Sequence, residues 1–315
     1  MAQYINKILC GDAAEVLKTL PEDSVQCCVT SPPYYGLRDY GAAGQLGLES
    51  DVDDYLNKLL AIFDEVHRVL KPDGVLWVNI ADSYAGSGKG GAKDPNNAAK
   101  YKQGSNKGSC ASAKIAKIKS SLPAKNLMLV PQRFVIRMQS AGWIVRDDII
   151  YEKANPMPES VKDRLTNSYE HIYMFAKNKK YYFNAEAATE AAIGFNNDPI
   201  AGSKGALGNL QTRRRRLNYN LKNIESKTGL RKMRNVWKMS TASGKSSIHY
   251  ARFPDELARR CITLSSHEGD LILDPFVGSG TTCRVASRYG RYYIGIDINA
   301  DYCAAAMRNI PESLF

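Results

Sequence analysis

Short apolar runs alternate along this chain with longer amphipathic segments. Residues 25–30 and 74–80 are apolar runs of strand length. Between them, residues 51–70 place apolar side chains at steps of three and four, which is typical of an amphipathic helix with one buried face. Pro72 and Gly74 follow, and they predict the end of this helix because proline cannot continue it. The N-terminal part of the chain is therefore predicted to contain a strand, a helix and a second strand.

The same alternation continues over the remaining chain with one long interruption. After Asn184 the pattern dissolves into Gly, Asn, Ser and basic residues until about Ile248. Alternation on both sides of this interruption predicts one α/β fold, with a mostly parallel sheet and helices on both faces. The further predicted elements are a strand at 5–10, a helix at 130–141, a strand at 143–151, a hairpin from 169–176 and 180–184, a helix at 254–266, a strand at 271–274, a helix at 281–289, a strand at 292–297 and a helix ending near 309.

Composition narrows the class of protein. The chain has 315 residues, of which 44% are hydrophobic and 24% charged, close to the average of soluble globular proteins. No run of 18 apolar residues predicts a membrane span, and the N-terminus lacks the pattern of a secretory signal. The seven cysteines form no Cys-x-x-Cys pair, which argues against a disulfide framework and a zinc site. We therefore expect a reduced, cytoplasmic protein without a metal.

The net charge of +11 is unevenly placed. Residues 83–125 carry nine lysines and one aspartate, and residues 201–248 carry twelve lysines and arginines and one glutamate. These two segments hold net charges of +8 and +11, so the other residues together carry −8. An acidic body with two basic insertions is typical of an enzyme that binds a polyanion. Two solvated loops without a ligand are the alternative interpretation.

A glycine-rich turn follows the predicted strand 271–274. It reads Asp274-Pro275-Phe276-Val277-Gly278-Ser279-Gly280 and leads into a helix, whose N-terminus favours polar or anionic groups. Nineteen residues after Gly278, Asp297 ends the next strand, where a carboxylate can accept hydrogen bonds from ribose hydroxyls. Cys283 occupies the place of the third glycine of a dinucleotide fingerprint. The pattern therefore predicts a nucleoside cofactor and favours one without a pyrophosphate.

The sequence Ser31-Pro32-Pro33-Tyr34 follows the predicted strand 25–30, at the strand end where open α/β sheets keep their active sites. The two prolines fix the backbone and remove two amide donors. What remains is a rim of carbonyl oxygens, the Ser31 hydroxyl and aromatic faces. Such a rim suits a planar substrate with an exocyclic amine, because the acceptors orient its N–H bonds while a ring stacks on Tyr34. A turn with surface tyrosines is the structural alternative.

The Ser-Pro-Pro-Tyr sequence, the glycine-rich turn 274–280 and the strand ending at Asp297 together resemble motifs of the S-adenosylmethionine-dependent DNA amino-methyltransferases. The tetrapeptide precedes the glycine-rich loop, with a long variable segment between them, and this order is similar to the circularly permuted β class. The resemblance covers most of residues 4–82 and 126–184 and nearly all of 249–315. It implies a Rossmann-like class I methyltransferase fold and S-adenosyl-L-methionine as cofactor.

The resemblance also implies roles for matching positions. Ser31, Pro32, Pro33 and Tyr34 would be catalytic. Residues 143–184 resemble the segment around the target base, including Lys153, Arg164, Glu170 and His171, whose individual roles stay open. The residues expected to bind the cofactor are Asp12, Ala13, His249, Phe253, Asp274, Phe276, Gly278, Ser279, Gly280, Thr281, Thr282, Asp297 and Ile298. For Asp12 and His249 a purely structural role is the alternative.

The resemblance also bears on the target base. An amine inside a duplex is out of reach, so the nucleotide is expected to be flipped out and stacked on Tyr34. Ser31 and the Pro32 carbonyl would hold the amine for direct displacement, and no cysteine follows a proline as a nucleophile would in cytosine-C5 enzymes. A first-position serine is commoner among cytosine-N4 enzymes of the family. Cytosine N4 is therefore favoured, with adenine N6 as the alternative.

The resemblance places a target-recognition region at residues 185–248, between a catalytic half at 1–184, which includes the basic loop 83–125, and a cofactor-binding half at 249–315. Within this region, basic residues would contact DNA, with Tyr219 and Trp237 beside them. Double-stranded DNA is the expected partner; a cognate restriction endonuclease and a homodimer stay open, and no membrane is implied. The expected DNA-binding residues are Arg213, Arg214, Arg215, Arg216, Lys222, Arg231, Lys232 and Arg234.

Three other functions stay open at this stage. One is methylation of RNA or of a protein amide. The two basic insertions favour a nucleic acid over a protein as the substrate. Another is an NAD-dependent oxidoreductase, disfavoured by Cys283 and by the lack of a catalytic His/Lys pair. The last is a DNA-binding module without activity, which the intact Ser-Pro-Pro-Tyr sequence disfavours.

Overall fold

The computed structural model describes residues 1–37, 42–86, 121–156, 158–159, 161–191, 230–241 and 252–311. The chain divides into two compact units, one of residues 1–183 with 235–315 and one of residues 184–234. No helix in the described ranges is both long and apolar enough to cross a bilayer. The larger unit contains the tetrapeptide at 31–34, the glycine-rich loop and Asp297, while Arg231, Lys232 and Arg234 lie in the smaller unit.

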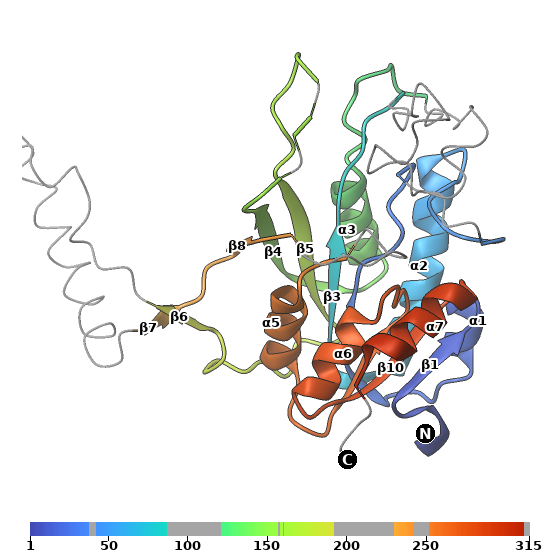
Figure 1. The fold of residues 1–315 in the computed structure, drawn as a ribbon, viewed down its shortest axis with the longest axis vertical. Helices are drawn as coiled ribbons and strands as arrows, with labels where there is room; N and C mark the ends of the chain where they lie inside the picture. The colour runs from blue at the N-terminus through green and yellow to red at the C-terminus, as the bar shows by residue number, and fades with distance from the viewer. Residues whose placement is uncertain are drawn as a thin grey trace, which may run out of the picture. The chain divides into compact units, whose positions relative to one another are not determined.

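Strands and helices alternate along the larger unit (Figure 1). Its strands are β1 (Lys7–Cys10), β2 (Val25–Thr30), β3 (Leu70–Ile80), β4 (Ile144–Lys153), β5 (Tyr169–Ala176), β8 (Val236–Met239), β9 (Leu271–Asp274) and β10 (Tyr292–Asp297). Its helices are the 3-10 helix η1 (Ala2–Tyr4) and the α-helices α1 (Ala13–Lys18), α2 (Val52–Val69), α3 (Val130–Ser140), α5 (Asp255–Ser265), α6 (Thr281–Arg288) and α7 (Ala300–Asn309).

The eight strands form one sheet in the order β1-β10-β9-β2-β3-β5-β4-β8. Neighbouring strands are parallel except β5, which runs antiparallel to both β3 and β4. The chain winds from β2 through α2 to β3 in one direction and from β9 through α6 to β10 in the other. The predicted mostly parallel α/β fold is confirmed, and β2 and β9 lie at the point where its winding reverses.

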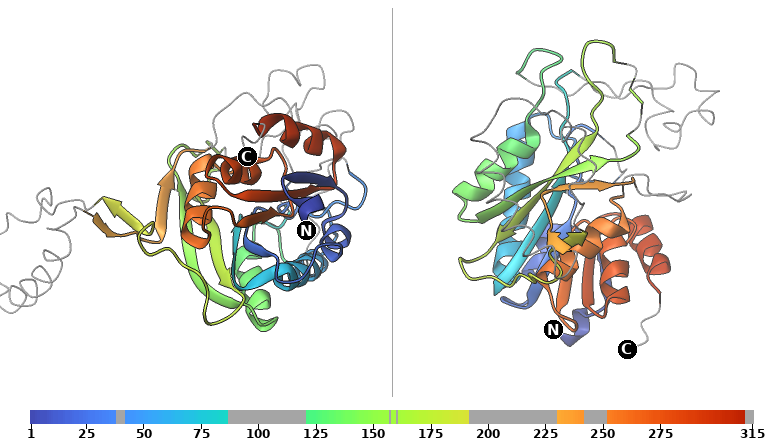
Figure 2. Two further views of the ribbon diagram at one scale, coloured as in Figure 1. Left: turned by 90° about the horizontal axis from the view of Figure 1, so that it is seen from below. Right: turned by 90° about the vertical axis from the view of Figure 1, so that its left-hand side faces the viewer.

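Helices cover both faces of the sheet, with α2 and α3 on one side and α5 and α6 on the other (Figure 2). On the first side, Leu56, Phe63 and Phe134 are fully buried against the sheet, in the main core cluster. On the other side, Cys261 and Cys283 are fully buried. These helices follow from the amphipathic spacing because each has one apolar stripe to bury.

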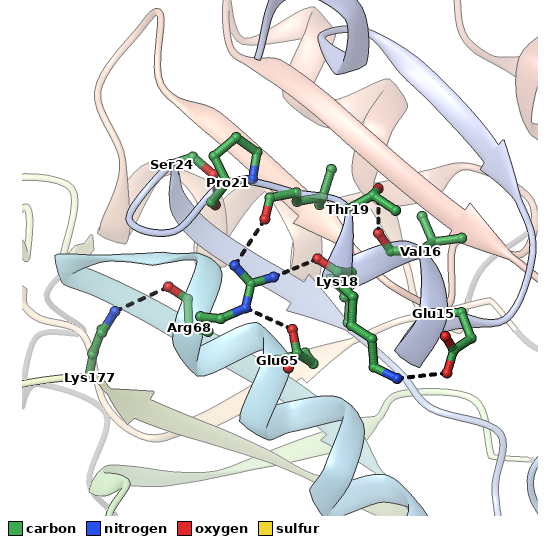
Figure 3. A network of polar contacts seen from close by, with 11 residues as sticks. Glu15, Val16, Lys18, Thr19, Pro21, Ser24, Glu65, Arg68 and Lys177 are labelled. Carbon is green, nitrogen blue, oxygen red and sulfur yellow. Dashed lines mark hydrogen bonds and ion pairs between the residues drawn. The ribbon is translucent and has the colours of Figure 1, made fainter.

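The short helix α1 is held by the end of α2 (Figure 3). The Arg68 guanidinium donates from Nη2 to the Leu17 carbonyl at 2.8 Å and from Nη1 to the Leu20 carbonyl at 3.0 Å, while its Nε donates to Glu65 at 2.8 Å. Carbonyls at a helix end lack partners within the helix, so a cation there satisfies them and complements the helix dipole. A six-residue helix would not be stable alone.

Two sequence expectations differ from the structure. The predicted hairpin at 169–176 and 180–184 is wrong, because β5 pairs with β3 and β4 and residues 181–184 form no strand. The Tyr182 amide instead donates to the Asp73 carbonyl at 3.0 Å. The expected irregular stretch before Ile248 contains β8 at the sheet edge, paired with β4. Trp237 on β8 is 3% exposed and packs 6.2 Å from Trp77, so it is a core residue and not a base-reading one.

The smaller unit contains a two-stranded antiparallel sheet of β6 (Thr189–Ala191) and β7 (Leu230–Lys232). Glu190 on β6 accepts from Arg231 at 2.9 Å and from Arg234 at 3.1 Å. These ion pairs neutralise part of the basic charge that the sequence assigns to DNA.

Gly295 on β10 provides a test of how tightly β10 is packed. A Cβ atom at this position would lie 2.7 Å from Ile8 Cδ1, 2.7 Å from Val277 Cγ2 and 3.0 Å from Cys283 Sγ. Gly295→Ala is therefore expected to lower the free energy of unfolding by about 1–3 kcal/mol through overpacking. Urea unfolding measures this, with Tyr292→Thr at an exposed position of the same strand expected to change it by less than about 0.5 kcal/mol. Equal stability of both variants would contradict the packing argument.

Candidate active site

The carboxyl ends of β2 and β9 lie side by side, although they are far apart in the sequence. Cys28 pairs with Leu273 in parallel register. Beyond this pair, β2 leads into Ser31 and β9 leads into the glycine-rich loop. Ligands of open α/β sheets bind in the crevice outside the carboxyl ends of the strands at such a reversal point. The tetrapeptide and the loop therefore meet at the carboxyl ends of the central strands.

The carboxyl group of Asp274 joins the two segments. Thr30 Oγ1 donates to Asp274 Oδ1 at 2.6 Å, and Thr282 Oγ1 donates to Asp274 Oδ2 at 2.7 Å. The Phe276 amide donates to Asp274 Oδ1 at 3.1 Å, and Thr282 Oγ1 also lies 3.1 Å from the Val29 carbonyl. Asp274 is 2% exposed. Its side chain is thus used inside the protein, where it fixes the end of β2 against the start of α6.

Burial raises the pKa of Asp274 to about 6. The cause is desolvation, which disfavours the charged carboxylate, while the hydrogen bonds from Thr30 and Thr282 oppose it. Desolvation is the larger effect, so the buried carboxyl titrates near neutral pH. This makes the junction of the two segments sensitive to pH.

The glycine-rich loop adopts backbone conformations that favour glycine. Gly278 has φ 51° and Gly280 has φ 84°. A Cβ atom on Gly280 would lie 3.1 Å from Ala306 Cα, because α7 approaches the loop closely there. Gly280 also precedes Thr281, the first residue of α6. Ser279, Thr281 and Thr282 are buried at this turn, which brings backbone rather than side chains to the loop surface.

Asp297 lies across the same loop at the end of β10. Its Oδ2 accepts from the Gly278 amide at 2.9 Å, and its Oδ1 accepts from the Asn299 amide at 2.9 Å. The side chain is half-buried, and burial raises the pKa of this carboxyl. Each carboxylate oxygen can accept a second hydrogen bond. Asp297 therefore both holds the loop and can receive hydroxyl groups from a ligand.

The first strand also ends at this edge of the sheet. Asp12 caps α1, since its Oδ1 accepts from the Ala14 amide at 2.9 Å and the Glu15 amide at 3.2 Å. Its Oδ2 accepts no hydrogen bond within the described residues. Ala13 is buried beneath it. The structural role of Asp12 is therefore present, and it leaves one carboxylate oxygen for a ligand.

The tetrapeptide is held by contacts to its backbone. Tyr55 Oη donates to the Pro33 carbonyl at 2.8 Å. Gly47, with φ 94°, approaches the Tyr34 carbonyl so closely that a Cβ atom there would lie 2.9 Å from that oxygen. Pro32 is buried, and its carbonyl accepts no hydrogen bond within the described ranges. The corner is therefore fixed at Pro33 and Tyr34, next to a Pro32 carbonyl that has no partner in the described part of the chain.

The Tyr34 hydroxyl lies in a polar network that spans three further strands. Tyr34 Oη donates to Glu170 Oε2 at 2.8 Å and accepts from Asn79 Nδ2 at 2.7 Å and from Ser31 Oγ at 3.2 Å. Asn79 Nδ2 also donates to Glu170 Oε2 at 2.7 Å, and Lys153 Nζ lies 2.6 Å from Glu170 Oε1. The sequence did not single out Asn79, although an amide inside the apolar run 74–80 is a signal that could have done so.

Several buried polar atoms at the end of β3 have no hydrogen-bond partner among the described residues. They are Asn79 Oδ1, Asp82 Oδ2 and Ser83 Oγ, together with Gln132 Oε1 on α3. Burial also raises the pKa of the Asp82 carboxyl. Such atoms are uncommon in native proteins, and a polar ligand can satisfy them.

The other predicted site residues are distributed as follows. Phe276 packs on the core, and Ile298 and Phe253 are half-buried. Lys232 is exposed, while Arg231 and Arg234 pair with Glu190. His249, Arg213, Arg214, Arg215, Arg216, Tyr219 and Lys222 lie outside the described residues.

Comparisons with known proteins agree with this geometry. The N6_N4_Mtase family, described as DNA methylase, matches residues 25–308. The chain is 39% identical over 301 residues to the Type II methyltransferase M.Cfr9I of Citrobacter freundii, covering 95% of this chain and 86% of that protein.

Two solved structures share the fold. The PvuII DNA methyltransferase (cytosine-N4-specific) matches with a TM-score of 0.61 and 20% identity, covering 98% of this chain and 87% of that one. A putative DNA modification methylase of Thermus thermophilus, complexed with S-adenosyl-L-methionine, matches with a TM-score of 0.57 and 23% identity, covering 98% and 95%.

Asp274→Asn tests the buried carboxyl. A raised pKa means that the folded state retains the proton, so this stabilisation is complete below about pH 4 and is lost as the pH rises through about 6. Over that window the free energy of unfolding of the wild type should fall by about 2–3 kcal/mol relative to Asp274→Asn. Urea unfolding between about pH 4.5 and 7.5 measures this.

Asp270→Asn is the matched control, because Asp270 forms a more exposed ion pair with Lys71 at 2.9 Å beside the same strand. Its stability difference from the wild type should change little over the same pH window. A difference between wild type and Asp274→Asn that does not vary with pH would contradict the assignment.

Proposed function

Because this chain belongs to the N6/N4 family of DNA methylases, we propose that it methylates the exocyclic N4 of a cytosine flipped out of double-stranded DNA. The observation that carries the proposal is the junction at Asp274, which sets Ser31-Pro32-Pro33-Tyr34 beside the glycine-rich loop. Methylation of adenine N6 is the alternative within the same family. Methylation of RNA or of a protein amide is more remote.

S-adenosyl-L-methionine is the cofactor of this family, and the loop residues fit it. We propose that Asp297 receives the ribose hydroxyls, with the backbone of Gly278 and Gly280 beside the ligand and Asp12 Oδ2 facing the adenine amine. The cofactor supplies an electrophilic methyl group on a sulfonium. Asp274, which the sequence assigned to the cofactor, is proposed instead to position the loop, since its carboxylate is bonded inside the protein.

The tetrapeptide supplies acceptors for the target amine. The Pro32 carbonyl and the Ser31 hydroxyl would accept hydrogen bonds from the two N–H groups of the amine. This orientation draws the nitrogen lone pair out of conjugation with the ring. The Tyr34 ring would stack on the base, and this stacking, worth about 1–3 kcal/mol, would offset part of the cost of flipping. Positioning and lone-pair localisation are then the chain's main contributions to rate.

Cytosine is favoured by the serine at the head of the tetrapeptide, which is commoner among cytosine-N4 enzymes of the family. Ser83 Oγ, a buried hydroxyl without a partner in the described chain, is a donor that could serve N3 or O2 of a cytosine. The cytosine-N4-specific PvuII enzyme shares the fold, which supports the same choice.

Nucleoside analysis by mass spectrometry tests the reaction. Duplex DNA treated with the chain and S-adenosyl-L-methionine should yield N4-methyl-2′-deoxycytidine. Ser31→Ala should lower kcat by about 100-fold or more, because an acceptor at the reacting amine is lost. Ser24→Ala, at the opposite end of β2, removes a hydroxyl whose one hydrogen bond among the described residues is to the Pro21 carbonyl, and it should leave kcat unchanged. N6-methyl-2′-deoxyadenosine without the cytidine product would replace the proposal by the adenine alternative.

We assign target recognition to the basic residues of 185–248, with the lysine-rich stretch 83–125 as a second duplex contact. If six or more phosphate contacts form, affinity for duplex DNA should fall about 10³-fold or more between about 50 and 200 mM salt. Replacing Arg213, Arg214, Arg215 and Arg216 by alanine should lower the slope of log affinity against log salt by about 3–4. A cognate restriction endonuclease and a homodimer stay predictions.

Lys179→Ala/Lys180→Ala is the matched control for this titration. Both lysines follow β5, whose end lies at the edge of the sheet away from the tetrapeptide. The double variant removes two positive charges outside both basic segments, so its salt dependence should match that of the wild type. A quadruple arginine variant with the wild-type slope would exclude these arginines as phosphate contacts.

A further inference from the structure

A hydrogen-bond chain runs from the catalytic serine to a carboxylate two strands away. Ser31 Oγ lies 3.2 Å from Tyr34 Oη, and Tyr34 Oη lies 2.8 Å from Glu170 Oε2. Glu170 stands on β5 and its other oxygen contacts Lys153 of β4 at 2.6 Å. Nothing in the tetrapeptide itself requires these partners, so they call for an explanation.

The chemistry of the groups fixes the direction of each bond. A carboxylate can only accept, so the phenol proton of Tyr34 points to Glu170. The phenol oxygen then accepts from Ser31, and also from the Asn79 amide at 2.7 Å. An Asn79 rotated by 180° would aim its carbonyl at the Glu170 carboxylate, where two acceptors repel. The donors therefore run in one direction, from Ser31 to Tyr34 to Glu170.

This direction decides what Ser31 presents to a substrate. A hydroxyl can donate or accept, and a serine that donated to the target nitrogen would occupy the lone pair needed for attack. With its proton directed to Tyr34, Ser31 offers only lone pairs to the amine. We propose that Glu170 is a positioning residue that sets this direction, so that Ser31 acts as an acceptor of the amine N–H. The inference rests on the proposed function and holds for either target base.

The surroundings of Glu170 support a fixed charge there. Its side chain is 12% exposed, and that of Lys153 is 23% exposed. The Asn79 amide donates to Glu170 Oε2 at 2.7 Å, so both carboxylate oxygens have donors. A largely buried carboxylate with a cation and an amide as donors is held more firmly than a surface ion pair. The charge that orients the chain is therefore anchored by two strands.

Glu170→Gln removes the charge while keeping the size of the side chain. We expect kcat for methyl transfer to fall about 10- to 100-fold, with KM for DNA and the affinity for S-adenosyl-L-methionine within about twofold of wild type. Glu65→Gln is the matched control, because Glu65 on α2 forms a partly buried ion pair with Arg68 at 2.8 Å, outside the candidate site. It should leave kcat unchanged. A Glu170→Gln enzyme as active as Glu65→Gln, while the wild type methylates DNA, would overturn the inference and leave the proposed function intact.

A second variant separates positioning from general support of the fold. Tyr34→Phe keeps the ring for stacking but breaks the chain between Ser31 and Glu170. Because Glu170 acts through the phenol, the double variant Tyr34→Phe/Glu170→Gln should have the kcat of Tyr34→Phe within about twofold. Losses that multiply would show that Glu170 acts independently of Tyr34 and would also overturn the inference. A wild type that methylates no exocyclic amine would instead refute the proposed function.

Discussion

The buried carboxyl of Asp274 is the constraint on which the active-site geometry depends. Desolvating a carboxyl is costly, and three donors compensate for it: two threonine hydroxyls from different segments and the amide of Phe276. Since Thr30 ends β2 and Thr282 lies in the first turn of α6, each donor fixes one of the two functional segments. Loss of either threonine would leave a buried acceptor with fewer partners.

The sheet explains how residues so distant in sequence meet. β2 and β9 are neighbours, and the chain winds away from them in opposite directions. The loops that follow the two strands therefore lie side by side at the carboxyl ends, whichever strand comes first in the sequence. The order of the tetrapeptide and the glycine-rich loop along the chain does not decide whether they meet, because their meeting depends on the adjacency of β2 and β9. The long basic segment between β6 and β7 is inserted without interrupting these central strands.

Periodicity predicted the helices from α2 onward because each carries one apolar stripe, as in α2 and α5, but it did not predict the six-residue helix α1. It failed where pairing is decided by distant partners. The run at 180–184 has the tyrosines of a strand but lies beyond the sheet, and the four residues of β8 are hidden in a basic stretch although β4 pairs with them. The motif residues could be recognised in the sequence because their spacing is local. The link between Tyr34 and Glu170 joins positions 136 residues apart, and no local pattern records it.

The choice of a serine at the head of the tetrapeptide gives that network a physical reason. A carboxylate, or the carbonyl of an amide, is an acceptor by its own bonding, so its polarity toward an amine needs no support. A hydroxyl has no such fixed polarity, and its proton must be directed elsewhere before it can serve as an acceptor. Tyr34 receives that proton and Glu170 orders Tyr34, so a charge held between β4 and β5 performs a task that an acidic first residue would perform alone. The serine and the polar network around Glu170 therefore belong together, because the hydroxyl acts as an acceptor only while the network holds its proton.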